Sequence, residues 1–163
     1  MYVWDVSQTE GKELFDEPQG DVTTQLPRLI EFVKKQGIKL DYSDKIAPAK
    51  GMSYGGAIRL LPNMAPAEEF ATLVHEVAHE MIHKAERRNF ITKTVRETEA
   101  EAIAFVVSQA VGLENGTASS DYIQLYHGNA KLLQESLEIV QRTAAVILGA
   151  IAPEVTAEKA VQQ

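Results

Sequence analysis

The sequence predicts an α+β fold in which a small β-sheet packs against several helices. Short segments rich in β-branched and aromatic residues gather in the first 61 residues, and longer segments with helical spacing of apolar residues dominate the remainder. The chain has 163 residues, and its hydrophobic and charged fractions of 45% and 24% are those of a globular protein. We therefore expect one domain over residues 1–152, followed by a polar tail at 153–163.

The N-terminal part should supply two strands and one helix. Residues 2–6, YVWDV, have the composition of a short strand, and residues 7–20 have that of a loop. Between 21 and 36 the apolar residues recur at helical spacing, and Gly37 is a natural helix stop. Residues 38–42 alternate in polarity, as a half-buried strand does.

A β-hairpin should follow, because Gly55 and Gly56 separate MSY from AIRLL and can supply the positive φ angles of a two-residue turn. Pro66 suits a first helical turn and opens a helix over 67–85. Further helices are predicted at 93–111, 120–127 and 130–150. In the last of them we expect four apolar side chains in the core: Leu133, Leu137, Val140 and Ile147.

Composition excludes several classes of function. The formal net charge of −7 would repel the phosphate backbone, so we expect no direct nucleic-acid binding by these 163 residues. The absence of cysteine leaves histidine and carboxylates as ligands for a transition metal. There is no apolar run of the roughly 18 residues that a membrane span needs, and no signal-peptide pattern at the N-terminus. We expect no membrane partner and a cytoplasmic location.

The stretch HEVAHEMIH, residues 75–83, holds three of the four histidines in the chain. On a helix, His75 and His79 lie one turn apart and can direct ring nitrogens at one ion, with Glu76 beside them. This is the HExxH arrangement of zinc peptidases, in which neutral imidazoles keep the ion Lewis-acidic and the glutamate accepts a proton from water. We therefore predict a zinc site with Glu76 as general base and then general acid.

The pattern alone is weak, because three fixed positions arise by chance in roughly one chain of this length in a few hundred. Its context is stronger, since the helix would separate a site face from a core face. The predicted core face comprises Phe70, Leu73, Val74, Val77, Met81 and Ile82. His83 would lie about 12 Å along the axis from His75, too far to share an ion, so we interpret it as a supporting, packing or substrate-side residue. The alternative is a set of ordinary surface histidines.

A catalytic zinc needs a third protein ligand, whose identity the spacing leaves open. The acidic helix RETEAEAIAF, residues 96–105, is a better source than His127, which has no companion motif. Glu97 and Glu101 share one face, and Glu99 points away from both. An apolar stripe runs between Glu97 and Glu99, so periodicity does not choose between them. All three glutamates could instead be solvated.

HEVAH followed by a helix with ETEAE resembles the gluzincin-type zinc peptidases, especially the metallopeptidase domains of ArdC-type antirestriction proteins and the ImmA/IrrE family. YVWDVSQTEGK, AKGMSYGGAIRLLP and SSDYIQLY also resemble segments of ArdC-type proteins, so the likeness covers most of the chain. It implies a zincin-like fold and metal-dependent peptide-bond hydrolysis. The basic DNA-binding domain of ArdC-type proteins has no counterpart in this sequence, and we expect it upstream in a longer protein.

The resemblance also implies roles for individual residues. Glu97 matches the start of an ExxA(D/N/E) pattern and would be the third metal ligand, and Glu101 would support a ligand histidine. Tyr122 in SSDYI would stabilise the oxyanion, with His127 and Tyr126 as further candidates. The alternative for Tyr122 is a half-buried aromatic residue with its hydroxyl in water.

Peptidases of this type bind an extended peptide along the edge strand that precedes the active helix, so we expect the substrate along 57–61. Arg59 could contact it or keep the edge soluble. The expected function is zinc-dependent proteolysis by the protease domain of an ArdC-like antirestriction protein. Two alternatives stay open: an ImmA/IrrE-like protease that cleaves a repressor, and a non-catalytic, metal-stabilised module that blocks a nucleic-acid enzyme.

Overall fold

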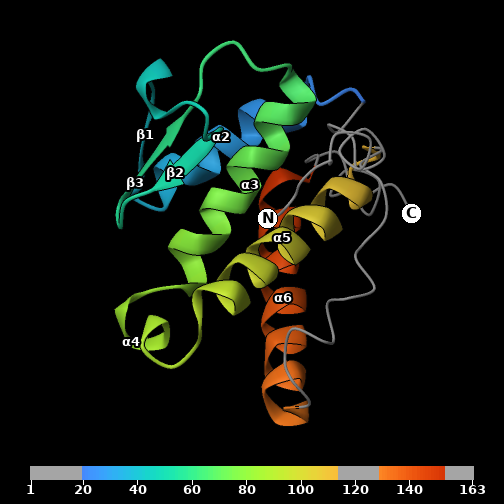
Figure 1. Cartoon of the computed structure of the whole chain (residues 1–163). Coiled ribbons are helices and arrows are strands. Elements are labelled where there is room, and N and C mark those ends of the chain that lie inside the picture. Colours follow the sequence, from blue (N-terminus) through green and yellow to red (C-terminus); the bar gives the residue numbers. More distant parts are fainter. Residues whose placement is uncertain (1–19, 114–128, 153–163) are drawn as a thin grey trace, which may run out of the picture.

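A computed structural model describes residues 20–113 and 129–152, in which a three-stranded sheet packs against four long helices (Figure 1). In chain order the elements are α2 Gln25–Lys35, β1 Lys39–Tyr42, a 3-10 turn at Asp44–Ile46, β2 Gly51–Ser53, β3 Ala57–Leu60, α3 Pro66–Ile82, α4 Ala85–Arg88, α5 Lys93–Ala110 and α6 Ala130–Ile151. The predicted α+β class is confirmed. The predicted strand at 2–6, the helix at 120–127 and the tail at 153–163 lie outside the described residues.

The sheet has the strand order β1-β3-β2, with β3 parallel to β1 and antiparallel to β2. The predicted hairpin is confirmed, and Gly55 and Gly56 form its turn with φ angles of +72° and +103°. The prediction of an edge strand at 57–61 is wrong, because β3 has a hydrogen-bonded neighbour on each side. Arg59 on this central strand binds Asp41 of β1 through two nitrogens, at 2.8 and 3.1 Å.

One hydrophobic core joins the sheet to the helices. Ile58 and Leu60 of β3 are buried on the face toward the helices. In Figure 1, α3 (green) runs between the sheet on one side and α5 and α6 on the other. Its predicted core face is confirmed for four residues that are fully buried, Phe70, Leu73, Val74 and Val77, while Met81 and Ile82 pack at the margin. The sheet therefore fixes the rotation of α3 about its own axis.

The last helix packs against α5 and α2 through a stripe of small and branched side chains. Val140 and Ile147 are buried in this stripe, as predicted. The prediction was wrong for Leu137, which is 44% exposed because it lies beside the buried stripe and not on it. Although α6 is 22 residues long, neither it nor any other helix in the described residues is long and apolar enough to cross a membrane.

One carboxylate on α3 holds the tip of the hairpin. Glu80 accepts hydrogen bonds from the backbone N–H groups of Gly55 at 2.9 Å and Gly56 at 2.6 Å, and from the hydroxyl of Ser53. Hydrogen bonds to an ionised group are roughly twice as strong as neutral ones. The hairpin is therefore attached to the helix that carries the HExxH residues.

We expect Glu80→Gln to loosen this attachment, because the amide loses the charge and turns an NH₂ group toward N–H donors. The free energy of unfolding in urea should fall by about 1–3 kcal/mol, and hydrogen exchange at Gly55 and Gly56 should accelerate. Glu138→Gln, at an exposed position of α6, is the matched control and should change stability by less than about 0.5 kcal/mol. Equal stability and exchange in the two variants would contradict the attachment.

Candidate metal centre

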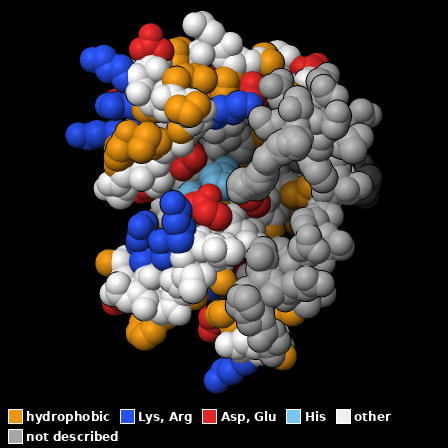
Figure 2. All heavy atoms as spheres, viewed as in Figure 1, with side chains coloured by type: hydrophobic (Ala, Val, Ile, Leu, Met, Phe, Trp, Pro, Cys, Tyr) orange, Lys and Arg blue, Asp and Glu red, His pale blue; other side chains and the backbone are white. Residues whose placement is uncertain are grey.

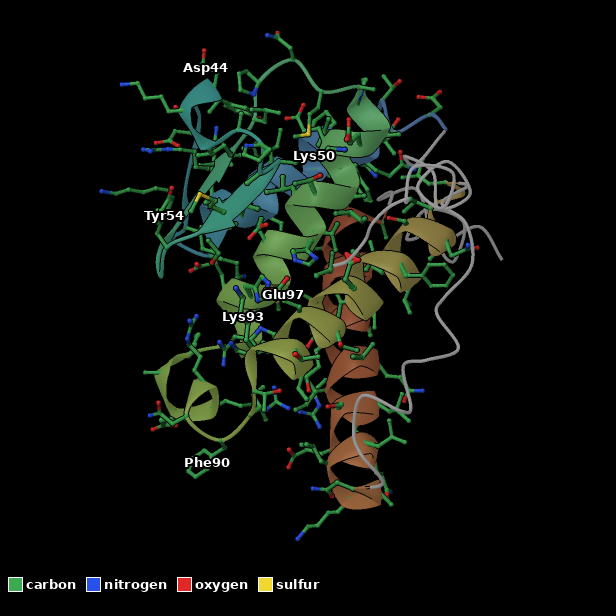
Figure 3. The ribbon with its side chains drawn as sticks, in the orientation of Figure 1. Asp44, Lys50, Tyr54, Phe90, Lys93 and Glu97 are labelled. Carbon is green, nitrogen blue, oxygen red and sulfur yellow. The ribbon has the colours of Figure 1, made fainter. Side chains whose placement is uncertain are left out.

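The carboxylate of Glu97 on α5 lies between ring nitrogens of the two HExxH histidines on α3. Its Oε1 is 3.2 Å from Nε2 of His75, and its Oε2 is 3.1 Å from Nε2 of His79. One ligand atom from each of the three residues lies within 4.8 Å of the other two. Figure 3 shows Glu97 where α5 passes α3. The packing of these two helices thus assembles a group that could hold a metal ion.

The donor set fits zinc. Zinc binds imidazole nitrogen at about 2.0–2.1 Å and carboxylate oxygen at about 2.0–2.2 Å, and tetrahedral geometry then separates neighbouring ligand atoms by about 3.3 Å. Each Nε2 lies near that distance from a different oxygen of Glu97, 3.2 Å for His75 and 3.1 Å for His79, and one ligand atom from each of the three residues lies within 4.8 Å of the others. Side-chain exposure is 17% for His75, 12% for His79 and 47% for Glu97. Figure 2 shows histidine at the base of a hollow with acidic side chains beside it, so one side of the group faces solvent.

The charges in this group shift one another's pKa values. Burial lowers the pKa of His75, but contacts with Glu101 and Glu97 outweigh burial and raise it to about 10. The contacts with His75 and His79 hold the pKa of Glu97 well below its usual range. Without an ion, a protonated imidazole therefore faces ionised carboxylates. A divalent cation bound at the same place would supply the positive charge that the protonated imidazole otherwise supplies to those carboxylates.

Glu76 is buried beneath the edge strand β2. Burial raises the pKa of its carboxyl group, and the nearby His75 and His79 partly offset that effect. Gly51 of β2 lies against it, since a Cβ built on Gly51 would be 2.9 Å from Cγ and 3.0 Å from Oε2 of Glu76. The same atom would be 2.8 Å from Cγ2 of Thr72. Only glycine lets this strand pass so close, so β2 forms a wall beside Glu76.

Both histidines direct their second ring nitrogen away from Glu97. Nδ1 of His75 lies 3.4 Å from Glu101, whose side chain is 71% exposed. Nδ1 of His79 lies 2.8 Å from Nδ1 of His83, which is buried at the C-terminal end of α3. Each ring is thereby contacted on its Nδ1 side while Nε2 faces Glu97. This is the orientation that a shared cation requires.

Glu99 lies in the interior of the protein, a position that the spacing of the glutamates did not predict. The interpretation of three solvated glutamates is wrong for this residue, whose side chain is completely buried. It accepts hydrogen bonds from Arg87 at 2.6 and 2.7 Å, from the hydroxyl of Ser136, and lies 2.9 Å from Nε2 of His83. A signal was present, because Glu99 interrupts the i,i+4 series of Val95, Ile103 and Val107, all buried. A carboxylate in such a series needs partners.

The remaining predicted site residues, Tyr122, Tyr126 and His127, lie outside the described residues. A scan against protein-family models, a search of curated proteins and a search of solved structures each found no match. The class of the protein therefore rests on its own fold and site. It is an α+β protein whose His75, His79 and Glu97 form a candidate metal centre consistent with a zincin-like site.

Zinc binding near neutral pH should release at least one proton per ion, because His75, with its raised pKa, must lose a proton before Nε2 can bind the cation. The raised pKa also sets the sign of the pH dependence, so the affinity should increase as pH rises through the neutral range. Calorimetry in two buffers of different ionisation enthalpy measures the proton count. Glu97→Gln should weaken binding more than about tenfold. Binding without proton release, or unaltered affinity in the variant, would contradict the assignment.

Proposed function

We propose that this protein is a zinc-dependent peptidase, with His75, His79 and Glu97 as metal ligands and Glu76 as general base. The position of Glu97 between the two Nε2 atoms carries the proposal. Glu76 follows His75 on the same helix and supplies the carboxylate that hydrolysis needs. When bound, zinc supplies Lewis acidity that lowers the pKa of water and polarises a carbonyl group.

Proton transfer and the positioning of the ligands are carried out by side chains of this protein. Glu76 accepts the proton of the attacking water and passes it to the departing amine. Its burial under Gly51 keeps bulk water from one side of the carboxylate. Glu101 holds the ring of His75. The resemblance to ArdC-type proteins supports Tyr122 as the donor to the oxyanion, and this role stays a prediction.

We place the substrate along β2 in preference to β3. Among the described residues β2 pairs only with β3, so the backbone groups of its other edge can add an extended peptide. The same strand lies against Glu76 through Gly51, which brings a peptide on this edge close to the proposed base. We do not assign Arg59 to substrate binding, because its side chain is paired with Asp41 of the neighbouring strand β1.

The biological setting rests on resemblance. Likeness to ArdC-type proteins supports a role in antirestriction, and likeness to the ImmA/IrrE family supports cleavage of a repressor. The two settings share one chemistry and differ in the protein substrate. The net charge of −7 supports the proposal that this segment binds no nucleic acid itself.

Glu76→Gln should retain zinc and lose hydrolysis. Zinc affinity should stay within a few-fold of the parent, because the residue is not a ligand, while kcat should fall by about 10² to 10⁴. A fluorogenic peptide mixture and a chelator competition assay measure the two quantities. If the zinc-loaded parent cleaves no peptide, or if the variant cleaves at the parental rate, the peptidase proposal fails. A biological effect that survives in Glu76→Gln would favour the non-catalytic binding module.

Gly51→Ala should lower peptidase activity while the protein still folds and binds zinc. The added Cβ would press on Thr72 and Glu76, so β2 or the carboxylate must shift. Misplacement of a catalytic group by about 1 Å can lower the rate by about 10², and we expect kcat/KM to fall at least tenfold with zinc retained. Gly149→Ala is the matched control, because its Cβ meets no atom within 4 Å. Equal activity in the two variants would show that β2 does not constrain Glu76.

A further inference from the structure

We propose that His83 and Glu99 are positioning residues for the metal ligand His79, and that they hold its ring in the tautomer that presents a lone pair on Nε2. The inference rests on the proposed metal site and adds to it a buried relay, defined as His79, His83, Glu99 and Arg87. Within this relay, hydrogen bonds run from a ligand imidazole to a fixed, charge-balanced carboxylate.

The direction of each hydrogen bond follows from the chemistry of the rings. Nε2 of His79 faces Glu97 at 3.1 Å, and this nitrogen must be free of its proton to bind a cation. The proton of His79 is then on Nδ1, 2.8 Å from Nδ1 of His83, which must accept it. His83 therefore carries its own proton on Nε2, 2.9 Å from the Glu99 carboxylate. Each donor meets one acceptor in this assignment.

The burial of His83 and Glu99 favours one tautomer of His83 over the other. The side chains of His83 and Glu99 are both 0% exposed, so bulk water does not compete for either. Glu99 is itself fixed by two hydrogen bonds from Arg87, at 2.6 and 2.7 Å, and one from Ser136 of α6. A reversed tautomer of His83 would place an unprotonated nitrogen against the buried carboxylate. The protein would then bury two acceptors facing each other, which is strongly unfavourable.

The other histidine ligand, His75, has a weaker hydrogen-bond partner on its Nδ1 side. Nδ1 of His75 meets Glu101 at 3.4 Å, and that carboxylate is 71% exposed. Water can replace an exposed acceptor at this distance, whereas it has no access to the side chains of His83 and Glu99. The structure therefore assigns the two ligands different supports, one solvated and one buried. Removal of the buried support should affect metal binding more than removal of Glu101.

A merely structural role is the competing explanation, because Glu99 also joins α5 to α4 and α6. Nuclear magnetic resonance of the imidazole nitrogens in the zinc-loaded parent protein separates the two explanations without a variant. We expect His79 to be protonated on Nδ1 and His83 to be protonated on Nε2 with an unprotonated Nδ1. A zinc-loaded protein in which His83 carries its proton on Nδ1 would overturn the relay.

Two substitutions at one position then test the effect on affinity. His83→Phe removes the acceptor for His79, and His83→Asn can offer its amide oxygen near the place of Nδ1. Both lose the bond to Glu99, so a merely structural role predicts equal losses. We expect chelator competition to show zinc affinity about 10- to 100-fold weaker in His83→Phe, with substantial recovery in His83→Asn and a smaller loss in Glu101→Gln.

Cobalt absorption spectra of the same proteins report the ligand geometry independently of activity. We expect the spectrum of His83→Phe to differ from the parent and that of His83→Asn to approach it. Parental zinc affinity and an unchanged cobalt spectrum in His83→Phe would overturn the relay and leave the metal site intact. A parent protein that binds no zinc would overturn the proposed function instead.

Discussion

A buried carboxylate, that of Glu99, is the constraint on which the packing of the helices depends. A charge in the core is tolerated only when its oxygens have partners, because it has lost its hydration. Those partners come from three places in the chain: His83 at the end of α3, Arg87 in α4 and Ser136 in α6. These hydrogen bonds join α5 to α3, α4 and α6, and each of them requires a particular rotation and axial position of α5.

The candidate metal centre follows from that position. When Glu99 faces the core, Glu97 and Glu101 lie on the opposite side of α5, two residues away in each direction. There they meet the rings of His75 and His79, which lie on the side of α3 that faces α5. Carboxylates that would be solvated on an isolated helix thus lie beside two imidazole rings. The group that results could hold a metal ion.

The sheet completes the site from the other side. Glu80 binds the hairpin turn, and Gly51 allows the edge strand to lie directly on Glu76. A single helix, α3, therefore carries two of the three proposed ligands, the proposed base and the anchor of the edge strand within two turns. Its position between the sheet and α5 is the reason that residues distant in the sequence share one hollow (Figure 2).

Local spacing was enough to predict the α+β class, the Gly55-Gly56 hairpin and the pairing of His75 with His79, because each depends on residues within one turn or one hairpin. Glu97 needed a family resemblance, since Glu97 and Glu99 flank the apolar stripe of α5 alike. Packing alone made β3 the central strand and gave Glu99 its partners Arg87, His83 and Ser136, because these outcomes depend on contacts between segments far apart in the chain. Periodicity describes one element at a time, and it therefore carries no information about the rotation of one helix against another.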